Sequence, residues 1–344
     1  MPRLRVFRSP SADIFLNLAI EDHLFRTLPP DDRVLFLWTN EAAVVIGRYQ
    51  NPWIECRTAE IERDGVALAR RQSGGGTVWH DKGNLCFTFM SATHLMDRAA
   101  NIALVVRALR GLGLDAQAND RLDILIAGRK VSGSAFRESS GRSFHHGTLL
   151  VNSDLAALER YLAPGGTAHR AKGIRSVRAA VANLADTRVG LTVDSVAEAL
   201  AAEAALTWAE GSGAAPFAKA AIEDLDAVAL AADADVAAYR NRLASRQWRF
   251  GSSPPFALRL EAQRAALTLE IEGGKVREAA LEAVENRLTE TARTNTDSLK
   301  GLEYDQNALA AALRSLATRA AGDDEAAAET FNSFAAAAEE GRFA

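Results

Sequence analysis

Three consecutive glycines, Gly74 to Gly76, constrain the fold of this chain more than any other feature of its sequence. They lie between two runs of strand-forming residues, 66–71 and 85–90, so we expect β-sheet to hold the loop at both ends. Glycine leaves backbone N–H groups open to close approach by an anion. The pattern therefore predicts a phosphate-binding loop, although three glycines alone are more typical of a simple turn.

The residues around the glycines favour the binding interpretation over the turn. Polar side chains flank them on both sides: Arg70, Arg71, Ser73, His80, Asp81 and Asn84. Positive side chains beside backbone donors suit a phosphate, or the mixed anhydride of a carboxylate and a phosphate.

Composition narrows the class of protein. The chain has 344 residues, 48% of them hydrophobic and 24% charged, which is enough for a large core and a second, smaller domain. Its formal net charge of −4 argues against a general nucleic-acid-binding protein. No apolar stretch approaches the roughly 18 to 20 residues of a membrane span. Cys56 and Cys86 form no metal-binding pattern, so we expect a reduced, cytoplasmic protein without structural zinc.

Hydrophobic periodicity predicts an α+β fold. Helices are expected at residues 11–28, 97–112, 192–208 and 224–245, and strands at 34–38, 43–46 and 146–151. Because two or more strands recur between single helices, the large domain should contain a mixed or antiparallel sheet flanked by helices.

A change in composition predicts the domain boundary. Gly, Ser and two prolines at 248–256 indicate a linker between a catalytic domain, 1–247, and a small α+β accessory domain, 257–344. The accessory domain should begin with strands at 267–271 and 275–281 and end in two alanine-rich helices.

A hairpin at 122–136, turning near 127–129, is expected to present Lys130. Strand alternation would place Lys130, Ser132 and Ser134 on one face. Lys130 could then stabilise negative charge over the glycine loop, although most lysines at hairpin ends are only solvated.

Two further features can each be interpreted in two ways. His145 and His146 are adjacent on a strand and should point to opposite faces, so we expect one to line a pocket rather than the pair to bind zinc. The basic residues of segment 169–178 form either a solvated loop or a lid that closes over phosphates.

Four sequence blocks occur together in one order: residues 70–84 (RRQSGGGTVWHDKGN), 129–135 (RKVSGSA), 145–150 (HHGTLL) and 172–184 (KGIRSVRAAVANL). Together they resemble the lipoate-protein ligase A family, in its bacterial two-domain form, within the biotin/lipoate protein ligase superfamily. The resemblance implies a fold similar to the catalytic domain of biotin ligases.

The resemblance also implies a two-step reaction. Lipoate attacks the α-phosphate of ATP with the assistance of Mg²⁺, which gives lipoyl-AMP and pyrophosphate, and a lysine amine of the acceptor then displaces AMP. The implied acceptors are apo lipoyl domains on E2 subunits of 2-oxoacid dehydrogenases and the glycine cleavage H protein. A monomer without nucleic-acid or membrane partners is expected.

By position, the resemblance makes Lys130 the catalytic residue, bridging the lipoyl carbonyl and the phosphate. The residues implied for ATP and lipoyl-AMP binding are Arg71, Ser73, Gly75, Gly76, Thr77, Val78, Trp79, His80, Asp123, Lys130, Ser132 and His146. Asp123 is a candidate for Mg²⁺ or for the incoming amine, and the lid candidates are Lys172, Arg175 and Arg178.

Two departures and three rival functions accompany the resemblance. The chain has Leu122 where the family commonly has Asn, which removes a polar contact near the phosphates, and the hairpin that leads to Lys130 is short. An octanoyl or lipoyl transferase of the same superfamily needs a cysteine near the lysine, and neither Cys56 nor Cys86 stands where that nucleophile is expected. The second rival is a biotin ligase, which has a different glycine-loop pattern, and the third is a non-catalytic lipoate binder.

Overall fold

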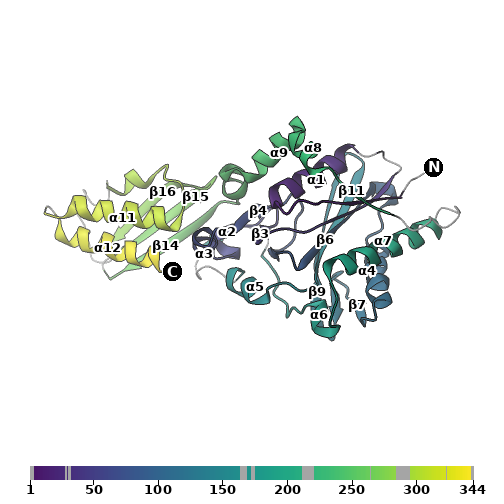
Figure 1. Ribbon diagram of the computed structural model, residues 1–344. Coiled ribbons are helices and arrows are strands. Elements are labelled where there is room, and N and C mark those ends of the chain that lie inside the picture. The colour runs from purple at the N-terminus through teal and green to yellow at the C-terminus, as the bar shows by residue number, and fades with distance from the viewer. Residues whose placement is uncertain are drawn as a thin grey trace. The chain divides into compact units, whose positions relative to one another are not determined.

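The computed structural model describes residues 4–27, 29, 32–162, 169–171, 175–210, 221–263, 265–283, 295–322 and 324–341 (Figure 1). The chain forms two compact units. The first comprises residues 1–48, 66–159 and 176–244, and the second comprises 49–65, 160–175 and 245–344.

A six-stranded mixed sheet is the centre of the first unit. Its strand order is β10-β11-β6-β2-β1-β13. The strands are β1 (Leu4–Arg8), β2 (Arg33–Trp38), β6 (Asn84–Ala92), β10 (Ser134–Ser139), β11 (Arg142–Leu150) and β13 (Ile222–Asp224). The β1 pairings with β2 and β13 are parallel, and the remaining pairings are antiparallel. The predicted α+β fold with a mixed sheet is confirmed.

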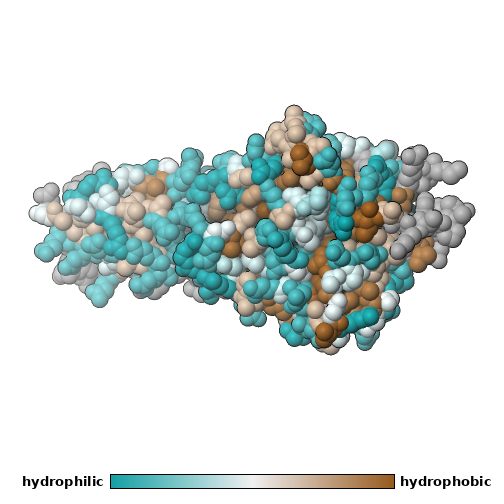
Figure 2. Space-filling view, viewed as in Figure 1, coloured by the Kyte–Doolittle hydropathy of each residue, from teal (hydrophilic) through white to brown (hydrophobic). Residues whose placement is uncertain are grey.

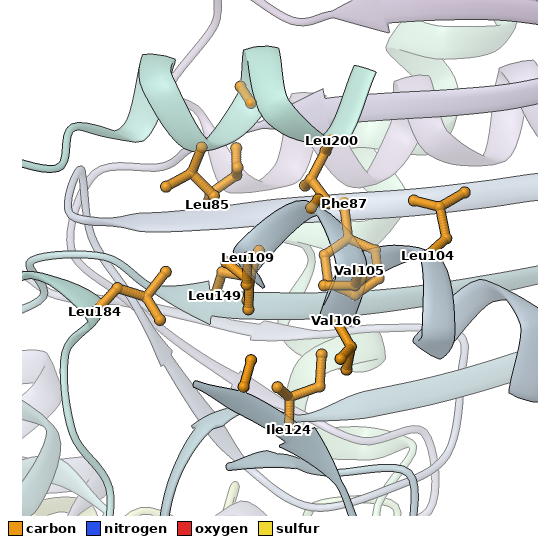
Figure 3. Close-up of a cluster of buried hydrophobic side chains, with 14 of the residues drawn as sticks. Leu85, Phe87, Leu104, Val105, Val106, Leu109, Ile124, Leu149, Leu184 and Leu200 are labelled. Carbon is orange, nitrogen blue, oxygen red and sulfur yellow. The ribbon is translucent and has the colours of Figure 1, made fainter. Parts of the chain in front are cut away.

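The main core lies between this sheet and two helices, α4 (Arg98–Gly111) and α7 (Val193–Glu210). Figure 3 shows sheet residues such as Phe87 facing Val105 of α4 and Leu200 of α7. Asp97 caps α4 by accepting a hydrogen bond from the N–H of Ala100, as its position before the apolar repeat predicts. Burial of these apolar side chains stabilises the unit.

A second pair of helices, α1 (Ile14–Thr27) and α9 (Ala234–Ala244), packs together (Figure 1). The expected single helix at 224–245 is wrong, because the segment forms β13, α8 (Ala227–Ala232) and α9. The break falls at Asp233, whose carboxylate accepts hydrogen bonds from the N–H groups of Asp235 and Val236 and thereby starts a new helix.

The glycine loop belongs to a separate three-stranded sheet. Strand β3 (Ala43–Ile46) pairs in parallel with β4 (Ala67–Arg70) and antiparallel with β5 (Val78–His80). The loop is therefore held by sheet at both ends, as expected, but it leaves through β5 before the chain reaches β6. The strands at the two ends of the loop, β4 and β5, both pair with β3, which fixes the distance between the loop ends.

The predicted hairpin is confirmed as β8 (Ile124–Ile126) and β9 (Arg129–Ser132), to which β7 (Ala116–Ala118) adds. Its turn residues Ala127 and Gly128 have φ values of 48° and 75°, the left-handed pair that a two-residue hairpin requires. The hairpin does not continue to residue 136, because β9 ends at Ser132 and β10 joins the large sheet.

The second unit contains an antiparallel sheet, β12-β14-β15-β16. Its strands are β12 (His169–Ala171), β14 (Phe256–Ala262), β15 (Ala265–Glu272) and β16 (Lys275–Ala283), and its helices include α2 (Pro52–Glu55), α3 (Thr58–Arg63), α11 (Gln306–Ala320) and α12 (Glu325–Glu339). The apolar faces of β14, β15, β16, α11 and α12 form one core together with Trp53 of α2. The visible surface of α11 and α12 mixes hydrophilic residues with weakly hydrophobic ones (Figure 2). Short elements complete the chain: α5 (Leu155–Tyr161), α6 (Leu184–Thr187), a π-helical turn (Gln247–Gly251), and 3₁₀ turns (Thr93–Leu95 and Asp297–Leu299).

Residues far apart in sequence build the core of the second unit. Trp53 of α2 lies with its ring centroid 5.2 Å from Phe250, 5.2 Å from Phe256 and 5.0 Å from Tyr304. The second unit is therefore not limited to residues 257–344, and Phe250 and Phe256, which belong to the expected linker 248–256, pack within it. The functional labels of the predicted domains remain proposals.

Candidate active site

A cavity of about 210 Å³ in the first unit brings the motifs together. Nine of the predicted site residues line it: Arg71, Gly75, Gly76, Thr77, Val78, His80, Asp123, Lys130 and His146. Ser134, which strand alternation placed on the same face as Lys130, also lines it. Sequence reasoning did not assign the other lining residues: Leu18, Trp38, Val45, Cys86, Arg121, Gly133, Ala135, Gly147, Thr148, Ser176 and Val177. Polar groups thus share the cavity with apolar residues, a composition typical of small-molecule sites.

Arg71 holds the backbone of the glycine loop through hydrogen bonds. Its Nη2 donates to the carbonyl oxygens of Gly74 and Gly76, each at 2.7 Å, and its Nη1 donates to Val45 at 3.0 Å. Its Nε donates to Ser73 Oγ at 3.1 Å. Burial lowers the pKa of Arg71 to about 10. The guanidinium therefore shapes the loop, a role that its sequence position beside the glycines did not distinguish from direct ligand binding.

Two glycines are required by backbone geometry. Gly75 has a φ of +88°, and a Cβ there would lie 2.9 Å from Arg71 Nη2. A Cβ on Gly47 would lie 2.2 Å from the carbonyl oxygen of Gly75, so β3 and the loop pack backbone to backbone. Gly74, in contrast, has open space around its Cβ position.

The segment that follows residue 175 contacts the glycine loop. Ser176 Oγ accepts a hydrogen bond from the N–H of Thr77 at 2.9 Å. Of the predicted lid residues, Arg175 and Arg178 are exposed and do not line the cavity, while Lys172 lies outside the described residues. The uncharged Ser176 and Val177 line it instead. A search for cations could not have found them.

Lys130 lies beside the cavity with a carboxylate partner. Its Nζ is 2.6 Å from Asp123 Oδ1, and both side chains are about three-quarters or more buried. Asp123 is held by a turn in which Asn119 Oδ1 accepts from the N–H groups of Arg121 and Asp123. Within that turn Leu122 has a φ of 61°, a conformation that Asn adopts more readily than Leu.

The alternation of side chains along a strand predicted the wrong position for one hydroxyl group, that of Ser132. Ser134 lines the cavity, but Ser132 does not and is 1% exposed. The reason is Gly133, which separates β9 from β10 and interrupts the alternation. A Cβ on Gly133 would lie 3.3 Å from Lys130 Cε, so the glycine leaves room for the lysine side chain.

His146 and Ser73 belong to a buried hydrogen-bond network. Ser73 Oγ lies 2.7 Å from His146 Nε2, and His146 Nδ1 lies 2.9 Å from Glu21 Oε1. Thr88 Oγ1 donates to the same Glu21 oxygen at 2.7 Å. Ser73 is buried and does not line the cavity, and its hydroxyl contacts Arg71 and His146; its contact with a ligand stays a prediction.

His80 and Cys86 form a neutral part of the wall. Burial is the largest cause that lowers the pKa of His80 to about 3. Asn40 Nδ2 lies 2.9 Å from His80 Nδ1, and Asn84 Nδ2 donates to Cys86 Sγ at 3.3 Å. Burial also raises the pKa of the Cys86 thiol. Cys86 thus lines the same cavity as Lys130, contrary to its expected position, but it is held in the protonated, weakly nucleophilic form.

Trp79 and His145 do not line the cavity. Trp79 is buried, and its Nε1 donates to Asp81 Oδ2 at 2.8 Å. His145 points to the face opposite His146, with its ring packed against Phe136 and its Nε2 3.0 Å from Ser134 Oγ. Among the described residues, no three His, Cys, Asp or Glu side chains are grouped for metal binding.

Comparison with known proteins assigns the chain to a family. Residues 13–205 match the model of the lipoyl protein ligase A/B catalytic domain. A curated lipoate-protein ligase A from Psychrobacter cryohalolentis is 40% identical over 311 residues, which cover 89% of this chain and 90% of the relative. The chain belongs to the lipoyl protein ligase A/B family.

Two solved structures have the same fold as this chain. The structure of P. falciparum LipL1 in complex with lipoate has a TM-score of 0.62 at 24% identity and covers 90% of this chain and 94% of that one. A lipoate-protein ligase A bound with ATP has a TM-score of 0.55 at 24% identity and covers 73% and 99%. In the part of this protein that the structure describes, no helix is long and apolar enough to span a membrane.

Proposed function

We propose that this protein is an ATP-dependent lipoate-protein ligase that uses the cavity of the first unit for both steps. The observation that carries the proposal is the convergence of Lys130, Asp123 and the glycine loop on one cavity, in a chain 40% identical to a lipoate-protein ligase A. In the first step a lipoate carboxylate oxygen attacks the α-phosphorus, and the bond to pyrophosphate breaks.

The glycine loop and Lys130 act on the developing charge. Backbone N–H groups of the loop would face phosphate oxygens, and the Lys130 ammonium would lie between the acyl carbonyl and the phosphate. In the second step the acceptor amine attacks the carbonyl carbon, AMP leaves with its phosphate oxygen, and the amine loses a proton. Asp123, beside Lys130, is the candidate to receive that proton.

Mg²⁺ fits the site on the chemistry of its donors. Asp123 is the carboxylate among the described cavity-lining residues, and a single carboxylate suffices when phosphate oxygens and water complete an octahedral shell. The ion would neutralise phosphate charge when bound, and Asp123 Oδ2 would help to hold it. Chelation should stop pyrophosphate release, and Asp123→Ala should raise the Mg²⁺ concentration required.

The acceptors we propose are lysines on E2 lipoyl domains and on the glycine cleavage H protein, and the compartment is the cytoplasm. Two buried free thiols agree with a reducing compartment. Mass spectrometry of an apo lipoyl domain incubated with the protein, ATP, Mg²⁺ and lipoate tests the proposal. We expect one lipoyl amide on the acceptor lysine. An unmodified domain in the presence of active controls would contradict the assignment.

A further inference from the structure

Glu21 of α1 is a buried carboxylate that does not itself line the cavity. Only 4% of it is exposed, and its Oε1 receives hydrogen bonds from Thr88 Oγ1 and His146 Nδ1. Placing a carboxylate in a protein interior is costly unless donors compensate for the lost water. Its contact with a cavity-lining histidine indicates a role connected with the site.

The hydrogen bonds define a direction along the network. Because Glu21 is an acceptor, His146 donates from Nδ1–H, and its Nε2 is then the acceptor for the Ser73 hydroxyl. The Ser73 oxygen in turn accepts from Arg71 Nε. Each donor in this series therefore points from the loop toward Glu21.

Arg71 is the last residue of this series of hydrogen bonds, and it also holds the backbone of the glycine loop. Its Nη2 holds the carbonyl oxygens of Gly74 and Gly76, which fixes the peptide planes of the loop. Loss of Glu21 would allow His146 to carry its proton on Nε2. The Ser73 hydroxyl would then lose its acceptor in a site where water does not compensate.

We propose that Glu21 is a positioning residue for the phosphate-binding loop, acting through His146, Ser73 and Arg71. This inference rests on the proposed function, because it concerns the binding of ATP to that loop. It goes further by giving a role to a polar residue of α1 behind the cavity wall, outside the sequence blocks around the loop. Arg71 keeps its bonds to Val45, Gly74 and Gly76 without Glu21, so the effect should be partial.

The test compares Glu21→Ala, Ser73→Ala and the double variant in lipoate-dependent pyrophosphate release. Each single change should raise KM for ATP about 10-fold, and the double change should stay near 10-fold rather than reach about 100-fold, because the residues act as one unit. Glu21→Gln keeps an acceptor oxygen and should remain within about 3-fold of the wild type.

Ser143→Ala is the matched control. Ser143 lies on β11 with His146, is buried, and shares a hydrogen bond of 3.0 Å with Thr93, but it does not line the cavity. The Ser143→Ala substitution should lower the free energy of unfolding and leave KM for ATP unchanged. An unchanged KM in Glu21→Ala, or multiplied effects in the double variant, would overturn the proposal.

A measurement on the unmodified protein covers the case in which Glu21→Ala does not fold. Nitrogen-15 NMR of labelled histidine should show His146 with its proton on Nδ1 and not on Nε2. A proton on Nε2 would overturn the proposal. Failure of the wild type to release pyrophosphate would instead refute the proposed function, so the two failures are distinguishable.

Discussion

The ammonium nitrogen of Lys130 lies 2.6 Å from Asp123 Oδ1 beside the cavity that the glycine loop also lines. A bound phosphate and Asp123 would therefore compete for one cation. The pair holds the lysine side chain at the cavity wall before a ligand binds. Substrate binding would then exchange the Asp123 oxygen for a phosphate oxygen as the partner of Lys130 Nζ.

Lys130→Ala should reduce lipoate-dependent pyrophosphate release by about 100-fold or more, because removal of one charge-stabilising donor typically has an effect of that size. The assay is release of pyrophosphate from ATP, with circular dichroism to verify folding. Lys82→Ala is the control, since Lys82 is exposed, pairs with Glu41 and does not line the cavity. A fully active Lys130→Ala protein would contradict the assigned role.

Gly75→Ala and Gly74→Ala form a matched pair within the loop. The first places a side chain at a φ of +88° and 2.9 Å from Arg71 Nη2, whereas the second meets open space. Forcing alanine into a left-handed conformation costs about 1 to 2 kcal/mol. Gly75→Ala should therefore lower kcat/KM for ATP by about 10-fold or more, and Gly74→Ala should change it little. Equal effects of the two changes would show that loop geometry is not limiting.

Cys86→Ala should retain ATP-dependent lipoylation. Burial raises the pKa of this thiol, and a protonated thiol is a poor nucleophile. The experiment measures lipoyl transfer with free lipoate and ATP, and in parallel with an acyl carrier protein as donor. Loss of both activities in Cys86→Ala, with the fold retained, would favour the transferase mechanism.

Stability should fall on mild acidification because of His145. Burial lowers its folded pKa to about 3, whereas an unfolded histidine titrates near 6.5. The unfolded chain binds more protons between these values, so the contribution is complete above about pH 6.5 and decreases toward pH 3.

Urea unfolding at pH 7.5 and 5.5 measures this effect. The wild type should lose about 1 kcal/mol more than His145→Gln between the two values, and the two proteins should respond alike between pH 7.5 and 8.5. An identical loss at pH 5.5 would exclude His145 as the cause.

Ala127→Asn should stabilise the hairpin that presents Lys130. Ala127 is exposed at a φ of 48°, which Asn tolerates better than Ala, and Gly128 already fits the turn. We expect a gain of about 0.5 to 1 kcal/mol in the free energy of unfolding. Ala127→Val should have the opposite sign, because β-branching disfavours this conformation.

The sequence allowed much of the fold to be predicted, because local rules govern its helices and turns. Asp97 before an apolar repeat and Ala127-Gly128 between two strands each specify their structure without distant contacts. The break at Asp233 was missed, since an aspartate inside an alanine-rich segment is compatible with both one helix and two.

The composition of the site was less predictable because it depends on tertiary packing. The positions of Arg71, Gly75 and Lys130 followed from their motifs, but the hydrogen bonds that Arg71 makes to the loop did not. Glu21 and Trp38 gave no local signal, since each reaches the site only through strand and helix packing. Ser132 was misplaced because Gly133 ends the strand, which alternation alone does not reveal.

Trp53 has a consequence for how the gene can be divided. It lies between β3 and β4, which hold the glycine loop, yet it is buried with Phe256 and Tyr304 in the second unit. A fragment that ends near residue 244 would carry an unpartnered tryptophan, and its complement would lack part of its own interior. Functional halves of this protein would therefore have to be made by excising residues 49–65 from one and supplying them to the other, not by a single cut.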